Sequence, residues 1–288
     1  MNNPLHIPIV AIVGVGLIGG SLALALKEAG VAGHILGFDL DAQNLGQALQ
    51  LGVIDHACNG AEELGTADLI FLATPVLAMP AALSAIAPHL KPGAILTDGG
   101  SVKGAVITAL EPLLPSTLRY VPGHPISGTE RSGAQSAFAT LYRGKRCILT
   151  PTAHTDPQAL ALVTALWQAV GCEVILMAAE KHDRILAAIS HLPHMVAYAL
   201  VNAVGAYDRY EENILLYSAG GFRDFTRIAS SDPTMWRDIA LTNRDALLEM
   251  IERFEADLTI LKESIRAGDA PALHSYFLRS KLNRDAIL

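Results

Sequence analysis

The chain has 288 residues, of which 51% are hydrophobic and 17% charged, and its formal net charge is −7. This length favours two domains, and the acidic balance argues against nucleic acid and anionic membranes as partners, because both attract basic surfaces. The three cysteines, Cys58, Cys147 and Cys172, are widely spaced and form no CxxC pair, so we expect reduced thiols in a cytoplasmic protein. Residues 5–26 are apolar enough for a membrane span, but their glycines have the spacing of a phosphate-binding loop, so we predict a buried strand and helix and no membrane segment.

Strands and helices alternate through the first part of the chain. The expected elements, in chain order, are a strand at 7–13, helix 18–29, strand 34–39, helix 42–51, strand 68–74, helix 79–89 and strand 94–98. Two further strands, at 119–121 and 146–151, are expected to continue the sheet, and 173–177 to close it. This alternation is typical of βαβ units, so we predict an α/β, Rossmann-type, doubly wound and mainly parallel sheet in a domain at residues 1–178.

After residue 178 the pattern becomes helical, which predicts an all-helical domain at residues 179–288. A long apolar helix is expected at 180–207, with a kink at Pro193 because proline cannot donate a hydrogen bond within the helix. Asp232 and Pro233 have the residue types of a helix N-cap and first helical position.

A heptad stripe follows in the same region. Apolar residues recur at spacings of four and three at Leu247, Ile251, Phe254, Leu258, Leu261 and Ile265. Such a stripe packs against another helix, either of the same chain or of a second copy. We favour a homodimer through the C-terminal helices, because a small domain this apolar needs further surface to cover it.

A glycine-rich motif directly follows the first predicted strand and opens a helix. The residues expected to bind the pyrophosphate here are Gly14, Gly16, Leu17, Ile18 and Gly19. Asp39 ends the next strand, where a carboxylate accepts hydrogen bonds from ribose hydroxyls and repels a 2′-phosphate. The motif therefore predicts NAD rather than NADP as cofactor; the alternative is a glycine-rich turn in a fold that has lost its nucleotide.

Thr74 and Ser101 follow two further predicted strands, at the carboxyl ends where ligands bind in open α/β sheets. We expect both residues to bind the cofactor, with the Ser101 hydroxyl at the nicotinamide end of the crevice. For Ser101, an ordinary helix N-cap before Lys103 is an equal alternative on position alone.

Five motifs spread over nearly the whole chain carry a family resemblance. They are Asp98-Gly-Gly-Ser-Val-Lys103, Gly123-His-Pro-Ile-Ser-Gly-Thr-Glu130, Ser190-His-Leu-Pro-His194, Gly220-Gly-Phe-Arg-Asp-Phe-Thr-Arg-Ile228 and Ser231-Asp-Pro-Thr-Met-Trp236. In this order they resemble the prephenate and arogenate dehydrogenases of tyrosine biosynthesis. The resemblance implies NAD-dependent oxidative decarboxylation of prephenate to 4-hydroxyphenylpyruvate.

The resemblance also implies roles for individual residues. His124 is the expected catalytic base at the C4 hydroxyl of the substrate, a task that suits a neutral imidazole, and Ser101 is expected to orient the hydroxyl or the imidazole. Arg227 is the expected clamp for a substrate carboxylate, because a guanidinium binds carboxylate in a bidentate manner. His194 is expected to contact the pyruvyl side chain.

Thr129 and Glu130 are also expected at the substrate. Thr129 is a candidate hydrogen-bond donor. Glu130 and Asp224 are candidates to pair with Arg227 and gate the site, with a plain surface salt bridge as the alternative. We expect Arg223 to be a solvated surface charge and Trp236 to be part of the core.

Two histidines raise the question of a metal. His191 and His194 lie three residues apart, but no third ligand cluster accompanies them, so we expect no metal site.

Other functions remain open on the sequence. The nearest are arogenate dehydrogenase, which yields tyrosine, and a cyclohexadienyl dehydrogenase that uses both substrates. The 3-hydroxyacid dehydrogenases are more distant, since they use a lysine early in the second domain and residues 185–203 contain none. A non-catalytic NAD-sensing protein would tolerate the loss of His124.

Overall fold

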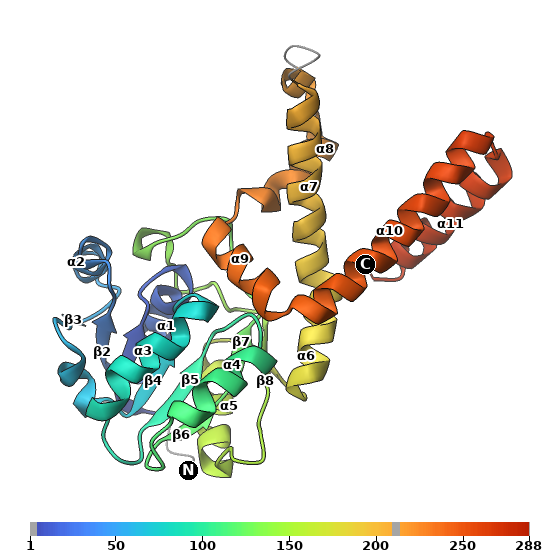
Figure 1. The fold of residues 1–288 in the computed structure, drawn as a ribbon. Coiled ribbons are helices and arrows are strands. Elements are labelled where there is room, and N and C mark those ends of the chain that lie inside the picture. Colours follow the sequence, from blue (N-terminus) through green and yellow to red (C-terminus); the bar gives the residue numbers. More distant parts are fainter. Residues whose placement is uncertain (1–4, 209–213, 288) are drawn as a thin grey trace. The chain divides into compact units, whose positions relative to one another are not determined.

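The computed structural model describes residues 5–208 and 214–287. The chain forms two compact units, one ending at Arg244 and one beginning at Asp245. The first contains both β-sheets and the helices up to α9, and the second consists of the helical residues that follow (Figure 1). The change from alternating strands to helices near residue 178 therefore lies inside the first unit.

Six parallel strands form the main sheet, in the order β3-β2-β1-β4-β5-β6. Their bounds are β1 (Ile7–Val13), β2 (Ala32–Phe38), β3 (His56–Ala57), β4 (Leu69–Leu72), β5 (Ile95–Asp98) and β6 (Arg119–Val121). Val13, the last residue of β1, pairs with Phe38 on one side and Leu72 on the other. The strand order reverses beside β1, so the ligand crevice of a doubly wound sheet lies at the carboxyl ends of β1 and β4. The predicted fold class is confirmed.

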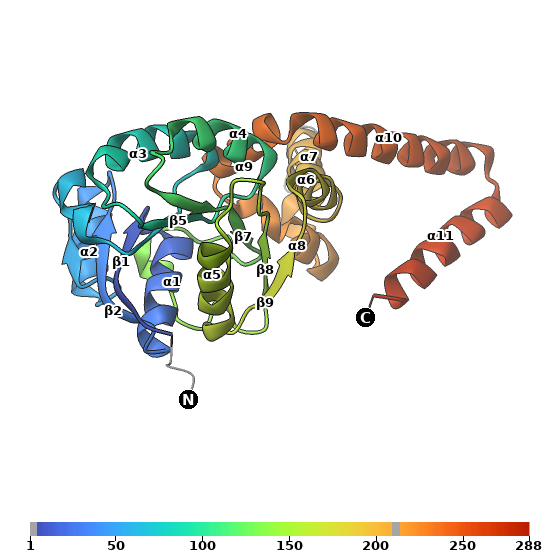
Figure 2. The same cartoon turned by 90° about the horizontal axis from the view of Figure 1, so that it is seen from below.

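Helices cover both faces of this sheet (Figure 2). The helices of this part of the chain are α1 (Leu17–Glu28), α2 (Ala42–Gln50), α3 (Met79–Ile86), α4 (Gly104–Leu110) and α5 (Pro157–Ala169). Successive residues of β1 point to opposite faces: Ile12 joins the core formed with α1 and α5, and Val13 joins the core formed with α3 and α4. Both faces are buried, which explains the continuous apolar runs of the strands.

A second sheet of three strands lies beside the first. Its strands are β7 (Gly123–Pro125), β8 (Arg146–Leu149) and β9 (Glu173–Leu176). β8 runs antiparallel to β7 and parallel to β9. The expectation that residues 146–151 and 173–177 extend the parallel sheet is therefore wrong. The chain leaves the first sheet at Pro122, because proline has no N–H to donate within a strand ladder. The Pro122 carbonyl accepts from Thr150 N, next to β8 of the second sheet.

This change also moves His124. No strand was predicted there, but His124 is the middle residue of β7 and pairs with Ile148. A strand holds a side chain more firmly than a loop does.

The helices after the second sheet are α6 (Ala179–Leu186), α7 (Leu192–Tyr207), α8 (Gly220–Thr226) and α9 (Pro233–Thr242). The predicted interruption of the long helix is a π-helical turn at Ala187–His191. Pro193 is the second residue of α7, one residue after this turn. The predicted cap is confirmed, because the Asp232 carboxylate accepts from Met235 N at 2.8 Å.

The combined helical run Ala179–Tyr207 is 29 residues long, and its most apolar 18-residue window has a mean hydropathy of 1.4. By length and composition alone it could cross a membrane. Only 22% of its apolar window is buried within the chain. Two of its histidines, His182 and His191, are nonetheless buried and hydrogen-bonded to protein groups. We interpret the run as a helix of a folded protein that is only partly covered by its own chain.

The second unit is formed by α10 (Arg244–Ala267) and α11 (Ala270–Asp285). Gly268 between them has a φ of +62°, a conformation that suits glycine at a helix end. The heptad stripe lies on α10, and its side chains are exposed at Phe254 (37%), Leu258 (51%) and Ile265 (61%).

Candidate active site

The glycine-rich loop between β1 and α1 has room for a phosphate. Gly14 has a φ of +92°, and a Cβ there would lie 2.8 Å from the backbone of Ala73, so a side chain does not fit. A Cβ at Gly19 would lie 2.2 Å from Gly14 O, which explains the third glycine. Gly16 instead has nothing within 4 Å of its Cβ position, and it caps α1 without a side-chain hydrogen bond. The N–H groups of the first turn of α1 therefore remain available for an anion.

Asp39 lies beside this loop, directly after β2. Its Oδ2 accepts from Val15 N at 2.8 Å, and its Oδ1 accepts from Asp41 N at 2.9 Å. Oδ2 also accepts from the side-chain amide of Asn44 at 3.3 Å. Oδ1 therefore has the further lone pair with which to accept from a ribose hydroxyl. The next residue, Leu40, is 97% exposed and adds no cation that would attract a 2′-phosphate.

Three further residues were predicted to bind the cofactor: Leu17, Ile18 and Thr74. Leu17 is buried, and Ile18 packs partly against the same core while its carbonyl accepts from the Tyr142 hydroxyl at 2.6 Å. Thr74 follows β4, and its buried Oγ1 has no hydrogen-bond partner in the described part of the chain. A ligand at the carboxyl end of β4 would satisfy this hydroxyl. Together these residues fit a dinucleotide with an unphosphorylated ribose.

Ser101 follows β5 and is half-buried. It does not cap α4, which was the alternative interpretation. The Asp183 carboxylate caps that helix from a distance in sequence, accepting from Lys103 N and Gly104 N at 2.8 Å each.

His124 is buried and hydrogen-bonded to a second histidine. Its Nδ1 lies 2.8 Å from Nε2 of His182, and Nδ1 of His182 lies 2.7 Å from Oδ1 of Asp183. Both imidazoles are buried, with His124 9% and His182 0% exposed. The three side chains form a continuous chain of hydrogen bonds from β7 to α6.

Burial keeps both histidines neutral. Desolvation lowers the pKa of His124 well below its ordinary value, and repulsion from His182 and Lys103 lowers it further. Burial likewise lowers the pKa of His182, and although the hydrogen bond to Asp183 opposes this effect, it does not cancel it. For Asp183, burial raises the pKa, but the hydrogen bonds from His182, Lys103 N and Gly104 N outweigh it, so the carboxyl pKa is lowered.

The buried ion pair between Lys103 and Asp98 is hydrogen-bonded to the first residue of β7. The Lys103 side chain is fully buried, and its Nζ contacts the Asp98 carboxylate and donates to Gly123 O at 2.6 Å. The Tyr120 hydroxyl donates to the other Asp98 oxygen at 2.8 Å. Since Gly123 precedes His124, this network fixes the backbone from which the His124 ring projects.

Arg227 and Glu130 form an ion pair of 2.8 Å between the segment after α8 and the loop after β7. The Arg227 side chain is 60% exposed and that of Glu130 34%. Of the two acidic partners considered for Arg227, the structure brings Glu130 to it; within the described residues no bond joins Asp224 to Arg227. Thr129 is exposed, and its hydroxyl accepts from Arg131 N at 3.2 Å.

His194 stacks on the indole of Trp236, with ring centroids 3.7 Å apart. Its Nδ1 lies 2.9 Å from Ser190 O, an acceptor, so Nδ1 carries the proton. Burial lowers the pKa of His194, and the charge of Arg227 lowers it further, which leaves Nε2 of the neutral ring as an acceptor. Trp236 is 6% exposed, as expected of a core residue.

His191 has a different environment. Its Nδ1 lies 3.0 Å from the side-chain amide of Asn243, and burial lowers its pKa to about 4. His191 and His194 thus each have one ring nitrogen engaged by a protein group.

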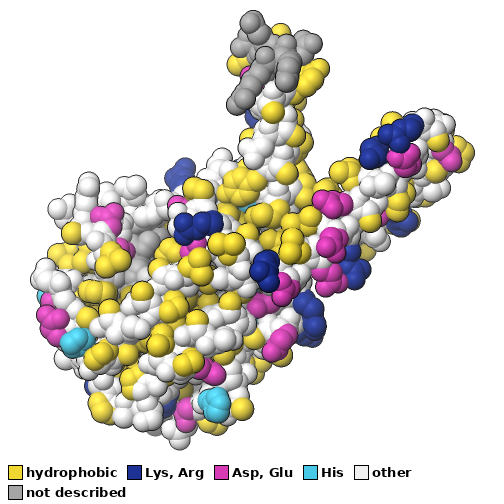
Figure 3. All heavy atoms as spheres, viewed as in Figure 1, with side chains coloured by type: hydrophobic (Ala, Val, Ile, Leu, Met, Phe, Trp, Pro, Cys, Tyr) yellow, Lys and Arg dark blue, Asp and Glu magenta, His cyan; other side chains and the backbone are white. Residues whose placement is uncertain are grey.

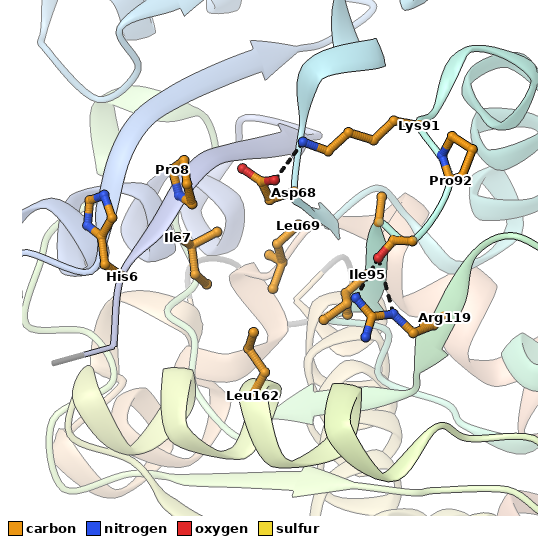
Figure 4. Close-up of a pocket in the computed structure, with 12 residues that line it drawn as sticks. His6, Ile7, Pro8, Asp68, Leu69, Lys91, Pro92, Ile95, Arg119 and Leu162 are labelled. Carbon is orange, nitrogen blue, oxygen red and sulfur yellow. Dashed lines mark hydrogen bonds and ion pairs between the residues drawn. The ribbon is translucent and has the colours of Figure 1, made fainter. Parts of the chain in front are cut away.

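A cavity of about 330 Å³ lies at the opposite end of the main sheet, among the first residues of β1, β4 and β5 (Figure 4). Its two cations already have partners: Lys91 Nζ bonds Asp68 at 2.5 Å, and Arg119 donates to Gly93 O at 2.5 Å. We therefore place the candidate site at the carboxyl ends of the strands, with the glycine loop and His124.

Known protein families match this chain along most of its length. The family models for the prephenate dehydrogenase nucleotide-binding domain and dimerization domain match residues 22–176 and 178–279, respectively. The chain belongs to the prephenate dehydrogenase family. It is therefore a dehydrogenase, as the motifs predicted.

Two relatives in this family align with nearly the whole of this chain. The chain is 41% identical over 283 residues to the cyclohexadienyl dehydrogenase of Zymomonas mobilis, covering 96% of this chain and 95% of that protein. It is 35% identical to the prephenate dehydrogenase of Bacillus subtilis, covering 96% and 76%.

Among solved structures, the prephenate dehydrogenase of A. aeolicus in complex with hydroxyphenyl propionate and NAD+ has a TM-score of 0.92 at 40% identity, covering 99% and 100% of the two chains. The Synechocystis arogenate dehydrogenase has a TM-score of 0.78 at 31% identity, covering 97% and 100%. Prephenate and arogenate dehydrogenases of the family thus have one fold.

No role was predicted from the sequence for three polar residues near His124. His182 and Asp183 lie outside every motif we singled out, and Lys103 lies in one of them without an expected function. The available signal was the adjacent His-Asp pair at the start of an apolar helix, which is common in proteins and points to no particular partner.

Proposed function

We propose that this enzyme catalyses the NAD-dependent oxidative decarboxylation of prephenate to 4-hydroxyphenylpyruvate, in the cytoplasm, as a step of tyrosine biosynthesis. The observation that carries the proposal is the buried, neutral His124, whose hydrogen bond to His182 uses Nδ1. Nε2 is then the ring nitrogen that can accept a proton. The reaction requires such a base at the ring hydroxyl, a hydride acceptor and donors for two carboxylates.

The cofactor-binding residues are those of the glycine loop, with Asp39 at the ribose and Thr74 toward the nicotinamide. NAD, when bound, supplies the acceptor for the hydride that leaves C4 of the substrate. The Asp39 carboxylate favours NAD over NADP because it accepts hydrogen bonds from ribose hydroxyls and repels a 2′-phosphate.

In this proposal His124 Nε2 takes the proton of the C4 hydroxyl as the substrate is oxidised, and Ser101 orients that hydroxyl. Oxidation at C4 makes the ring carboxylate a vinylogous β-keto acid, so carbon dioxide leaves and the ring becomes aromatic. The loss of carbon dioxide and the gain of aromaticity make the overall reaction effectively irreversible.

The substrate carboxylates need cationic and polar partners. We assign Arg227 as the carboxylate clamp, and its pairing with Glu130 holds the guanidinium ready while no substrate is bound. Thr129 is exposed on the same loop as Glu130 and donates to the substrate in this proposal. His194 faces the pyruvyl side chain.

Arogenate is the second candidate substrate, alone or beside prephenate. His194 donates through Nδ1 to Ser190 O and offers an acceptor at Nε2. An ammonium group, which arogenate has in place of the keto oxygen, is a donor that suits this acceptor. The 41% identity to a cyclohexadienyl dehydrogenase also supports dual specificity.

We infer that the enzyme is a homodimer formed through its C-terminal helices, with a nucleotide domain at 1–178 and a substrate and dimerisation domain at 179–288. Hydrophobic side chains are exposed on the surface near α7 (Figure 3). Tyr207, at the end of α7, and Leu216 and Tyr217, in the segment 214–217, are exposed. The match of residues 178–279 to a dimerization domain supports the same inference.

The test is a spectrophotometric assay of NADH or NADPH formation with prephenate and with arogenate, each with NAD and with NADP. We expect turnover with prephenate and NAD, accompanied by one carbon dioxide per NADH. Binding of NAD without turnover of either substrate would contradict the proposal and support a non-catalytic NAD-sensing protein.

A further inference from the structure

We propose that His182 and Asp183 act with His124 as a proton relay, in which His182 receives the Nδ1 proton of His124 while Nε2 of His124 takes the proton of the substrate. The inference rests on the proposed function, because it needs His124 to be the base. His182 is a positioning and proton-accepting residue in this account and does not touch the substrate.

The direction of every hydrogen bond follows from Asp183. Its two oxygens accept from Lys103 N and Gly104 N, and its lowered pKa keeps it ionised and therefore an acceptor only. Nδ1 of His182, 2.7 Å away, must then carry a proton. In the neutral His182 ring, Nε2 is consequently an acceptor.

The tautomer of His124 follows from that of His182. The acceptor Nε2 of His182 faces Nδ1 of His124 at 2.8 Å, so Nδ1 of His124 must be the donor. The other nitrogen, Nε2, then carries the lone pair that a general base needs. The reversed tautomer would place two lone pairs against each other in a buried site.

The contact between the rings accommodates one added proton but not two. If both rings were protonated, two N–H groups would face each other at 2.8 Å, beside the buried ammonium of Lys103. A single added charge is more stable on His182 than on His124, because Asp183 contacts His182 directly. Asp183 remains a carboxylate throughout and stabilises the imidazolium, as an aspartate does in a hydrolase triad.

The relay matches the proton balance of the proposed reaction. The C4–H bond breaks and its electron pair leaves as hydride to NAD, while the hydroxyl proton moves to Nε2 of His124 and the Nδ1 proton moves to Nε2 of His182. When the carboxylate leaves as carbon dioxide, its bonding electrons enter the ring and the C4 oxygen becomes a phenolate. The two protons then move back, the phenolate becomes a phenol, and no proton is exchanged with solvent.

Replacing His182 by glutamine separates the relay from simple positioning. A glutamine amide has an acceptor and a donor about as far apart as the two ring nitrogens, so it can hold His124 and Asp183, but it cannot take up a proton. We expect His182→Gln to lower kcat about 100-fold, within the range of general-base effects, with KM and the Kd for NAD unchanged. The matched control is His154→Gln, an exposed histidine, which should behave like the unchanged enzyme.

The decisive comparison repeats the substitution in a His124→Asn background, measured in single turnover. If His182 acts through His124, His182→Gln costs nothing further there. An equal loss in both backgrounds would show a structural role and overturn the relay, as would full activity of His182→Gln alone.

A measurement without turnover checks the same arrangement. Nitrogen-15 NMR of histidine-labelled enzyme should show His124 protonated on Nδ1 and not on Nε2, and the opposite result would overturn the relay. The unchanged enzyme is assayed first: absence of turnover with either substrate would contradict the proposed function, whereas turnover with an unaffected His182→Gln variant would contradict the relay alone.

Discussion

Nδ1 of His124 lies 2.8 Å from Nε2 of His182, so the tautomer of His182 determines which nitrogen of His124 is protonated. His124 comes from the middle of β7 and His182 from α6, the first helix after the second sheet. The tautomer of the base is therefore set by the packing of the helical region against the strands. In the proposed function, the acceptor nitrogen Nε2 of His124 is therefore available before any ligand binds.

The first prediction concerns pH. Because burial and the neighbouring positive charge lower the pKa of His124 below 6.5, the ring is still neutral at pH 6.5. We expect kcat/KM to remain at its plateau as the pH falls to 6.5 and to decline only below it. A half-maximal value at or above pH 6.5 in the pH profile would contradict this environment for His124.

The second prediction concerns the carboxylate clamp. Arg227→Ala should raise the KM for prephenate by about 10- to 100-fold, since a charge-assisted hydrogen bond contributes about 1.5–3 kcal/mol. The measurement is steady-state kinetics, and kcat should change much less than KM. Arg223→Ala, which removes an exposed arginine of the neighbouring helix, is the control, and an equal rise in KM there would argue against a specific clamp.

The third prediction concerns the cofactor. Asp39→Asn keeps the size of the side chain but removes the charge that repels a 2′-phosphate. We expect the ratio of kcat/KM for NAD to that for NADP to fall at least about tenfold, which corresponds to about 1.4 kcal/mol. An unchanged ratio would show that Asp39 only holds Val15 N and Asp41 N.

The fourth prediction concerns stability. The pKa of His191 is about 4 in the folded chain and 6.5 in the reference state, so below pH 6.5 the unfolded chain binds the additional proton. This group should lower the free energy of unfolding by about 1.4 kcal/mol per pH unit as the pH falls from 6.5 to 4. Urea denaturation at several pH values should show a shallower dependence for His191→Gln, and identical slopes would contradict the assignment.

Local patterns predicted five of the six strands of the main sheet, and the two-residue strand β3 was not predicted. The strands at 7–13 and 119–121 were expected with the bounds observed, and the glycine loop with Asp39 identified the ligand end of the sheet, because these features depend on residues near each other in sequence. The second sheet was missed, because whether β8 joins β6 or β7 depends on where the chain turns at Pro122.

The candidate site was predictable only in part, for the same physical reason. His124 could be singled out from its motif, but its partner His182 lies 58 residues away, on a helix whose packing no local pattern describes. The role of Asp183 was not predictable either, because it caps a helix that begins 79 residues before it. Polar contacts between distant elements are set by tertiary packing.

The most direct test of the account compares His124→Asn with the unchanged enzyme in NADH formation from prephenate, together with the Kd for NAD. Asparagine keeps a polar side chain but cannot act as a base at neutral pH. We expect kcat to fall by at least about 100-fold with the Kd for NAD unchanged. A variant that turns over prephenate at the rate of the unchanged enzyme would show that His124 is not the base.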